Sequence, residues 1–336
     1  MKRLIIGDLH FGVNEKDSNF IDYQAKSLGW IIDYANTNNL PCDFLGDLFD
    51  NRNSVTHTSI NHFKQFLSSI NDVGVIIVGN HDTHYKNTNE CNIIELLNND
   101  YCVAGLEPVE LGNSIYLPWI NDSTIDNVNK AIRNTTKKFC FGHLELSGFM
   151  LQKGIYSDTS HISKSKLKKF DLVVSGHYHL QSKQGNIIYL GTPYQTKLYD
   201  VGIDKYIMIL DDENGEYELI KNPYNYFMEI AIDNENDLPE ISTLLDKKIK
   251  IQLNTARTIT IEKWLNELVE NNANVSIQDN HTMQLIDLGD DDLKVNSNSV
   301  EEVWEEYLET IEIESDINEI DSIFKEELAK IKEGDN

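Results

Sequence analysis

The stretch Val75-Ile76-Ile77-Val78-Gly79-Asn80-His81-Asp82 joins four apolar residues to a glycine and three polar side chains. The apolar run predicts a buried strand, and the polar residues follow where that strand would end. The arrangement recurs four times: apolar runs at residues 4–6, 44–45, 139–141 and 172–174 precede Gly7-Asp8-Leu9-His10, Gly46-Asp47-Leu48-Phe49-Asp50, Gly142-His143 and Gly176-His177-Tyr178-His179. Because open α/β sheets bind ligands at the carboxyl ends of their strands, the five motifs predict one shared site.

The segments between the motifs predict an α/β fold for the first part of the chain. Apolar residues at helical spacing indicate helices at residues 20–35 and 60–70. After Gly176, short apolar runs at residues 186–190, 205–210 and 217–220 indicate further strands, separated by the glycine-containing turns at 184–185 and 214–215. The pattern therefore predicts parallel strands followed by antiparallel ones, with helices on both faces.

The rest of the chain predicts two regions beyond a first domain at residues 1–222. Residues 223–290 contain candidate strands at 227–232, 248–253 and 282–285 and a candidate helix at 261–270, which together predict a small α+β domain. Residues 291–336 open with a polar linker and continue with two apolar stripes at helical spacing, which include Trp304, Tyr307, Leu308, Ile320, Phe324 and Leu328. Isolated amphipathic helices cannot bury such stripes alone. They either fold back on the body or dock on a partner, and we expect a partner.

The composition indicates a soluble globular protein of the cytoplasm. The chain has 336 residues, of which 40% are hydrophobic and 25% charged. It shows no signal-peptide pattern and no apolar stretch of transmembrane length. Its four cysteines are scattered without a CxxC pair, which favours reduced thiols over a disulfide framework. A net charge of −26 disfavours non-specific nucleic-acid binding by the whole surface, although bound metal ions or a partner subunit could supply local positive charge.

The polar residues of the motifs predict a site for two divalent metal ions. We expect one ion to be held by Asp8, His10, Asp47 and His179, and the other by Asp47, Asn80, His143 and His177. Mixed oxygen and nitrogen donors without thiolate suit Mn²⁺, Fe²⁺ or Zn²⁺ in a catalytic rather than a structural site. Two such ions about 3.5–4 Å apart can activate water and clamp a phosphoryl group. One motif alone would be weak evidence, but five in order make coincidence improbable.

Two further motif residues are candidates for proton transfer. His81 follows the predicted ligand Asn80 and has no assigned metal, so we expect it to stabilise developing charge or to protonate the leaving oxygen. Asp50 could orient His81 through a hydrogen bond. Arg52, His84, Tyr85 and Lys86 are near enough to the motifs to be candidate substrate contacts. The remaining histidines are interpreted as surface or packing residues, namely His57, His62, His161 and His281.

The five motifs resemble those of the calcineurin-like metallophosphoesterases. Within that superfamily, residues 79–87, 142–149, 175–179 and 189–193 resemble the nuclease subunit of SbcC–SbcD-type DNA-repair complexes, and most of all the recombination endonuclease subunit of tailed bacteriophages. The resemblance implies a two-sheet sandwich flanked by helices, with a small α+β cap domain and a C-terminal helical pair. It departs from some cellular members at Asp50, where they carry a second catalytic histidine.

The resemblance also implies an activity and partners. The expected activity is manganese-dependent exonuclease and endonuclease cleavage of DNA in double-strand-break processing and recombination, with Mg²⁺, Fe²⁺ or Zn²⁺ as other candidate ions. The expected partner is an SbcC-type ABC ATPase with a long coiled coil, bound to a homodimer of this chain within a heterotetramer. The cap would face the DNA, and the C-terminal helices would dock on the coiled coil. No membrane association is expected, and a phage-encoded chain would work in the host-cell cytoplasm.

Two other functions remain open on the same residues. One is a free-standing phosphatase or cyclic-nucleotide phosphodiesterase, which would need neither the extra domain nor the helical tail. The other is a non-enzymatic recruiting subunit with a relict site, which the complete set of predicted ligands disfavours.

Overall fold

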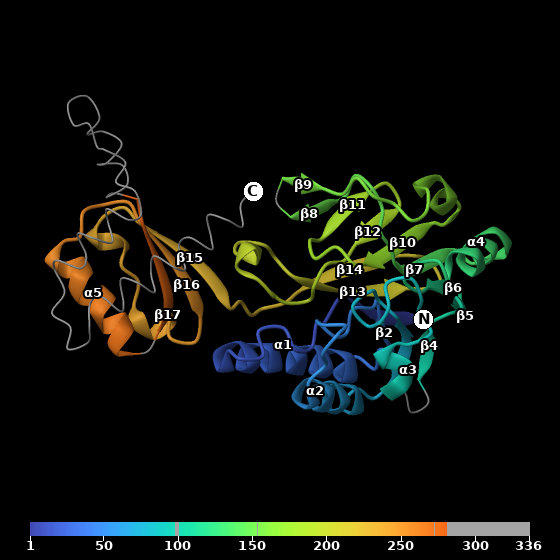
Figure 1. Ribbon diagram of the computed structural model, residues 1–336, viewed down its shortest axis with the longest axis horizontal. Coiled ribbons are helices and arrows are strands. Elements are labelled where there is room, and N and C mark those ends of the chain that lie inside the picture. The colour runs from blue at the N-terminus through green and yellow to red at the C-terminus, as the bar shows by residue number, and fades with distance from the viewer. Residues whose placement is uncertain (98–100, 153, 272, 281–336) are drawn as a thin grey trace, which may run out of the picture. The chain divides into compact units, whose positions relative to one another are not determined.

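The computed structural model describes residues 1–97, 101–152, 154–271 and 273–280 (Figure 1). The predicted strand at 282–285 and both predicted C-terminal helices lie outside the described residues. So do the six expected docking residues, which are Trp304, Tyr307, Leu308, Ile320, Phe324 and Leu328.

The first large sheet carries the first three motifs. Its order is β14-β13-β1-β2-β3-β4, and its strands are β1 (Lys2–Ile6), β2 (Cys42–Phe44), β3 (Val73–Ile77), β4 (Cys102–Ala104), β13 (Tyr206–Asp211) and β14 (Tyr217–Lys221). The strands β1 to β4 pair in parallel, whereas β13 and β14 are antiparallel. The helices α1 (Ser18–Thr37) and α2 (His57–Ser68) pack their apolar faces on this sheet, and α3 (Ile93–Leu97) precedes β4 (Figure 1).

The second large sheet carries the other two motifs. Its order is β11-β12-β10-β7-β6-β5, and its strands are β5 (Val109–Leu111), β6 (Ser114–Leu117), β7 (Phe139–His143), β10 (Leu172–Gly176), β11 (Ser182–Gln184) and β12 (Ile187–Tyr189). Helix α4 (Ile125–Asn134) and the 3-10 helix η1 (Lys164–Lys169) pack on its outer face. A small hairpin of β8 (Met150–Gln152) and β9 (Ile155–Tyr156) lies between β7 and η1 in sequence.

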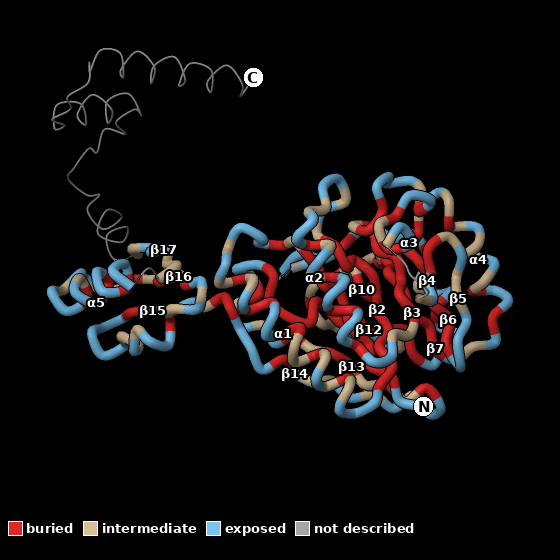
Figure 2. Tube along the Cα trace, turned by 90° about the horizontal axis from the view of Figure 1, so that it is seen from below, coloured by how far each residue is buried: buried red, intermediate tan, exposed pale blue. Residues whose placement is uncertain are grey.

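The two sheets bury a shared core. Strand residues from both sheets form one cluster of fully buried side chains, including Ile5, Val75, Tyr116, Phe141 and Val174. Figure 2 shows the central strands as buried and the outer helix surfaces as exposed. The two-sheet α/β sandwich flanked by helices is therefore confirmed.

A buried polar cluster links the sheets inside this core. Arg3 donates from Nε and Nη2 to the two carboxylate oxygens of Asp43, both at 2.5 Å. The Tyr116 hydroxyl, from the second sheet, donates to Asp43 Oδ2 at 2.7 Å. Because all three side chains are buried, a charge left without its partner would cost several kcal/mol. The cluster therefore fixes how β1 and β2 sit against β6.

A third sheet follows the sandwich in sequence. It has the order β15-β16-β17, with β15 (Phe227–Ile232), β16 (Lys248–Leu253) and β17 (Asn274–Asp279). Helix α5 (Ile259–Glu270) buries Ile261, Trp264, Leu265 and Leu268 on one face, and the short 3-10 helices η2 (Leu198–Asp200), η3 (Glu235–Asp237) and η4 (Ile241–Thr243) complete the described elements. The strand β17 was not predicted. One compact unit comprises Met1–Gln252 and Arg257–Gln278, and among the described residues Leu253–Ala256 and residues 279–280 fall outside it.

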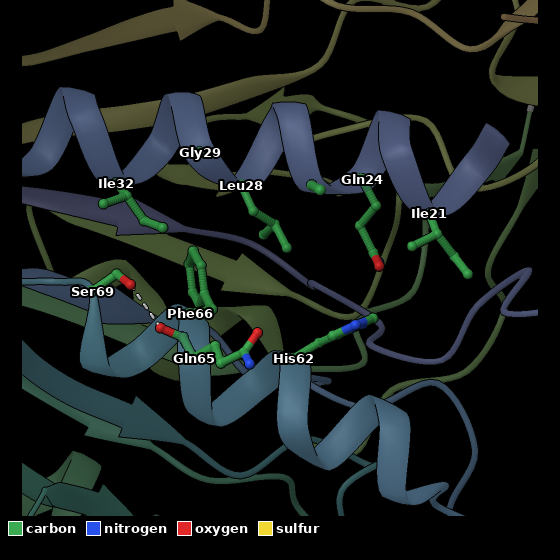
Figure 3. A pocket seen from close by; sticks show the side chains of 10 residues that line it. Ile21, Gln24, Leu28, Gly29, Ile32, His62, Gln65, Phe66 and Ser69 are labelled. Carbon is green, nitrogen blue, oxygen red and sulfur yellow. Dashed lines mark hydrogen bonds between the residues drawn. The ribbon is translucent and has the colours of Figure 1, made fainter. Parts of the chain in front are cut away.

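A groove of about 280 Å³ lies between α1 and α2 and is lined mainly by apolar side chains such as Ile21, Leu28 and Phe66 (Figure 3). No motif residue lines it, so it is not the site predicted by the sequence. Among the described residues, no helix is long and apolar enough to cross a membrane.

Candidate metal centre

The five motifs meet where the strands of both sheets end. Asp8 and His10 follow β1, Asp47 follows β2, and Asn80 and His81 follow β3; His143 ends β7, and His177 and His179 follow β10. The first sheet thus contributes the carboxylates and the carboxamide, while the second contributes three imidazoles.

One group of donors consists of Asp8, His10 and His179. Their ligand atoms all lie within 4.8 Å of one another. The Nε2 atoms of His10 and His179 face each other at 3.0 Å. Two nitrogen donors at right angles on one ion, each at about 2.0–2.1 Å, would lie about 3 Å apart. The pair therefore has the spacing of two ligands to one ion.

A second group consists of Asp47, His143 and His177, whose ligand atoms also lie within 4.8 Å of one another. The side-chain oxygen of Asn80 lies 3.0 Å from His143 Nε2 and 2.8 Å from His177 Nδ1, so it joins this group. Asp47 Oδ2 lies 3.3 Å from His143 Nε2. The structure thus brings all seven predicted ligands into two groups, with Asp47 in the second.

The donor set fits divalent cations. Asp8 is fully buried, and its Oδ1 has no hydrogen-bond partner. A buried carboxylate oxygen without a partner is costly unless a cation satisfies it. Together with the facing imidazoles, this oxygen indicates that the described residues are arranged for ions rather than for one another.

The protonation states of His177 and His179 agree with this. Burial, followed by the neighbouring charge of His143, lowers the pKa of His177 to about 3. Burial, followed by His10, holds the pKa of His179 well below its usual value. Both imidazoles are therefore neutral near pH 7, which is the form that binds a metal. Burial raises the pKa of Asp8 to about 7, and a cation would favour its ionised form.

The loops that present the donors are strained and tightly packed. His10, Asp47 and His177 all adopt positive φ angles, of 47°, 48° and 89°. Such conformations persist only where the surroundings enforce them. At Gly79 a Cβ atom would lie 2.2 Å from the Asp47 nitrogen, and at Gly176 it would lie 2.3 Å from Asp8 Oδ1. The glycines are therefore needed for the close approach of the loops.

Asp82 joins two of these loops, a role that was not predicted although its motif was recognised. Its Oδ1 accepts the Phe49 N–H at 3.1 Å, and its Oδ2 accepts the Gly79 N–H at 2.9 Å. The side chain is buried. It therefore holds the loop after β3 against the loop after β2, which carries Asp47.

His81 lies beside the two groups without belonging to either. Its backbone N–H donates to Asp47 Oδ1 at 2.7 Å, and its Nδ1 lies 2.5 Å from the Asp50 carbonyl oxygen. Because a carbonyl only accepts, Nδ1 carries the proton and Nε2 is left for another partner. We predicted a contact between His81 and the Asp50 carboxylate, but in the structure His81 contacts the backbone carbonyl of Asp50. That carboxylate lies 3.3 Å from His10 Nδ1 instead, because the chain turns its backbone toward His81.

The candidate substrate contacts fall into two pairs. Arg52 and His84 line a cavity of about 340 Å³ together with the buried Asp82. Tyr85 and Lys86 are exposed and do not line this cavity, although the rings of His84 and Tyr85 are in contact, with centroids 4.5 Å apart.

Lys205 supports the first group from behind and was not predicted. Its Nζ donates to the His179 carbonyl at 3.1 Å and to Asp200 Oδ1 at 2.6 Å, and the side chain is buried. The ammonium thus fixes the backbone of a donor residue, while Asp200 balances its charge. A single lysine before a strand carries no sequence pattern that would have revealed this role.

Adding Mn²⁺ to metal-free protein is expected to raise its melting temperature. An ion that binds only the folded chain stabilises it by about 4 kcal/mol at 1,000 times its dissociation constant. Differential scanning calorimetry with and without chelator would measure the shift. The Asp8→Asn variant should show a smaller shift, and an equal shift in both proteins would contradict the assignment of Asp8 as a donor.

Comparisons with known proteins identify the family of this chain and several proteins that it resembles. The model of the calcineurin-like phosphoesterase family matches residues 1–181. Exonuclease subunit 1 of Enterobacteria phage T4 is 28% identical over 323 residues, which cover 93% of this chain and 93% of that protein. Among solved structures, an archaeal phosphodiesterase matches with a TM-score of 0.34 and 18% identity, covering 66% of this chain and 99% of its own. A hypothetical protein from Thermus thermophilus matches with a TM-score of 0.40 and 10% identity, covering 66% and 100%.

Proposed function

Since this chain belongs to the calcineurin-like phosphoesterase family, we propose that it is a two-metal DNA nuclease with exonuclease and endonuclease activity. The observation that carries the proposal is the pair of adjacent donor groups, Asp8–His10–His179 and Asp47–His143–His177, built from both sheets. Hydrolysis of a phosphodiester places negative charge on oxygens that two neighbouring cations can stabilise.

Two divalent ions, for which we propose Mn²⁺, would supply Lewis-acid charge. This charge would lower the pKa of a water molecule, so that hydroxide would be available as the nucleophile near neutral pH. The described side chains would hold them, with the Asp47 carboxylate shared between the two. Oxygen and imidazole donors without thiolate suit Mn²⁺, as they suit Fe²⁺ and Zn²⁺.

His81 is proposed to hold or deliver a proton at the leaving oxygen through its Nε2. The Asp50 carbonyl fixes the ring through Nδ1, and the ring of His10 packs edge-on at 5.2 Å between centroids. A positioned imidazole of this kind contributes about 10²–10⁴ in rate. Asp50 would act on the site through its carboxylate near His10 rather than by charging His81.

DNA is the proposed substrate because the T4 relative is named as an exonuclease subunit and matches over nearly the whole chain. Because the T4 relative is named as a subunit, we also propose that this chain binds a partner protein. We propose an SbcC-type coiled-coil ABC ATPase that binds a homodimer of this chain in the host-cell cytoplasm, for processing of double-strand breaks during recombination. The region after residue 222 would contact DNA as a cap, and the segment after 290 would bind the ATPase.

A metal-dependent digestion assay tests the activity. Linear duplex DNA, single-stranded DNA and a mononucleotide would be incubated with Mn²⁺, with and without the ATPase. We expect cleavage of both DNA substrates and none without metal. If the protein released phosphate from the mononucleotide and left both DNAs intact, its function would be that of a small-molecule phosphatase rather than a nuclease.

Removing residues 296–336 is expected to uncouple the protein from its partner and to spare metal-dependent cleavage of single-stranded DNA. The segment contains no metal motif, and its 14 acidic residues against 3 lysines argue against DNA contact. Phe324→Asp or Trp304→Asp should reproduce much of the effect, because buried anchors carry most of an interface's free energy.

One truncated sample distinguishes this from fold-back of the tail. Melting temperature, basal nuclease activity and co-elution with the ATPase would be measured together. Loss of melting temperature and basal activity would mean that the tail packs on the body. Co-elution at wild-type affinity would rule out the docking role.

A further inference from the structure

A second polar cluster lies beside the metal centre and consists of Trp119, Glu145 and His161. The indole of Trp119 packs against two donor imidazoles, with ring centroids 5.0 Å from His177 and 5.8 Å from His143. It also meets His161 edge-on, with centroids 4.8 Å apart and an interplanar angle of 90°. His161 is therefore one aromatic ring away from the second donor group.

Glu145 orients the His161 ring. His161 Nε2 lies 3.3 Å from Glu145 Oε2, and the His161 backbone N–H donates to the Glu145 carbonyl at 3.2 Å. The other carboxylate oxygen, Oε1, accepts the Thr159 hydroxyl at 2.6 Å. Both oxygens of Glu145 are thus engaged, and its carboxylate can hold the imidazole in one orientation. A histidine without a function at the surface would need no carboxylate to orient its ring.

The His161 ring remains accessible, with 34% of its side chain exposed. Glu145 engages Nε2, which leaves Nδ1 for another partner. In the imidazolium form both ring nitrogens donate, so Nδ1 would donate to an oxygen of a phosphate. The chemistry of the accessible nitrogen therefore suits an anionic oxygen.

The chain directly after His161 is basic in a strongly acidic protein. Residues 161–169 contain Lys164, Lys166, Lys168 and Lys169 and no acidic residue, whereas the whole chain has a net charge of −26. Within the described residues, no ion pair within 4.0 Å involves these lysines. Three of them donate to neutral oxygens instead, as Lys166 does to Asn129 Oδ1 at 2.6 Å. Their charges therefore remain available to an anionic chain that lies along η1.

We propose that His161, held by Glu145 and Trp119, binds a backbone phosphate of the DNA strand next to the phosphodiester under attack, and that the lysines of η1 contact the phosphates beyond it. The inference rests on the proposed nuclease function. Contacts to phosphates fix the register of a strand without reading its sequence. This subsite would therefore favour polynucleotides over substrates that carry a single phosphate.

The test compares two substrates of the full-length protein loaded with Mn²⁺. A single-stranded oligonucleotide has neighbouring phosphates, whereas bis(4-nitrophenyl) phosphate is a diester with none. His161→Ala should raise KM for the oligonucleotide about 10-fold or more, the effect of losing a hydrogen bond to a charged group. Its kcat on the oligonucleotide and its kcat/KM on the small diester should stay within about 2-fold of wild type.

Salt dependence gives a second readout. For single strands, log(kcat/KM) decreases as log[salt] rises. In His161→Ala the slope of this plot should become shallower, by about 0.7 for each phosphate that the variant no longer neutralises. Lys166→Ala should lower the slope similarly, and His161→Arg, which keeps a cationic donor, should restore it. The matched controls are His57→Ala and Lys64→Ala, which change exposed residues of α2. Both should behave as wild type on both substrates.

The outcomes are distinct. Equal losses on both substrates in His161→Ala would mean that the cluster supports the metal donors through Trp119, and would overturn the subsite. An unchanged KM for the oligonucleotide and an unchanged salt slope would overturn it as well. A wild-type protein that hydrolyses the small diester but no oligonucleotide would instead refute the nuclease function on which the proposal rests.

Discussion

Replacing Asp47 with alanine or asparagine is expected to abolish hydrolysis and to reduce the number of metal ions bound. Asp47 Oδ2 lies among the donors of the second group, 3.3 Å from His143 Nε2. Loss of several kcal/mol of charge stabilisation by the ions corresponds to a factor of about 10³ or more in rate. Isothermal titration calorimetry would count the ions, and a nuclease assay would measure the rate.

The asparagine variant separates charge from folding. Asp47 has a φ of 48°, which asparagine tolerates better than alanine, and an amide oxygen can still accept the His81 N–H. Asp22→Asn, at an exposed position of α1, is the matched control and should bind metal and cut DNA as wild type does. An unchanged ion count in Asp47→Ala would show that Asp47 is not a ligand.

Replacing His81 with alanine or asparagine is expected to slow cleavage by about 10²–10⁴ while both ions stay bound. The side chain lies outside both donor groups, yet its ring is fixed by the Asp50 carbonyl. Single-turnover kinetics on a substrate with a poor leaving group would measure the chemical step, and calorimetry would verify the ion count. Wild-type turnover in the variant would remove His81 from the mechanism.

A companion variant exploits the orientation of Asp50. Asp50→Asn leaves the backbone carbonyl in place, so the contact with His81 should persist. Any effect should instead arise at His10, whose Nδ1 faces the carboxylate. We therefore expect a smaller loss of rate than in His81→Ala, accompanied by weaker metal binding. A loss confined to proton transfer, with unchanged metal affinity, would contradict this.

The sequence predicted the strands that carry the motifs because each of them is buried. The apolar runs at residues 4–6, 139–141 and 172–174 lie within β1, β7 and β10. The shift to antiparallel pairing also agrees with β13 and β14. Periodicity reports burial directly, so long apolar runs were sufficient for these elements.

Other elements carried too little signal. The strands β4 and β5 have three residues each, too few to show a period. In β17 most side chains are exposed or half-buried, so no apolar run marks it. The distribution of the motifs over two sheets was equally hidden, because strand pairing is set by contacts distant in sequence. The pairing of Leu4 in β1 with Ile209 in β13 is an example.

The residues around the donors could not be found from patterns either. His161 was interpreted as a surface or packing residue, since nothing near it in sequence indicates Trp119 or Glu145 as neighbours. Lys205 contacts the backbone of His179 and Asp82 that of Phe49, and such contacts leave no periodic trace in the sequence. Short motifs identify the metal donors, because these positions require particular side chains. The residues that support the donors are identified only by their contacts in the folded chain.

The division of the second donor group between two sheets has a mechanical consequence. Asp47 follows a strand of the first sheet and His143 ends a strand of the second, and 95 residues of the chain separate them. An ion held by both would act as a reversible cross-link that closes this long loop and removes entropy from the unfolded chain. The sheets could then separate only after the ion had left. Resistance to proteolysis should therefore follow the rate of ion release, so that two metals of equal affinity but unequal exchange rates would protect the chain to different extents.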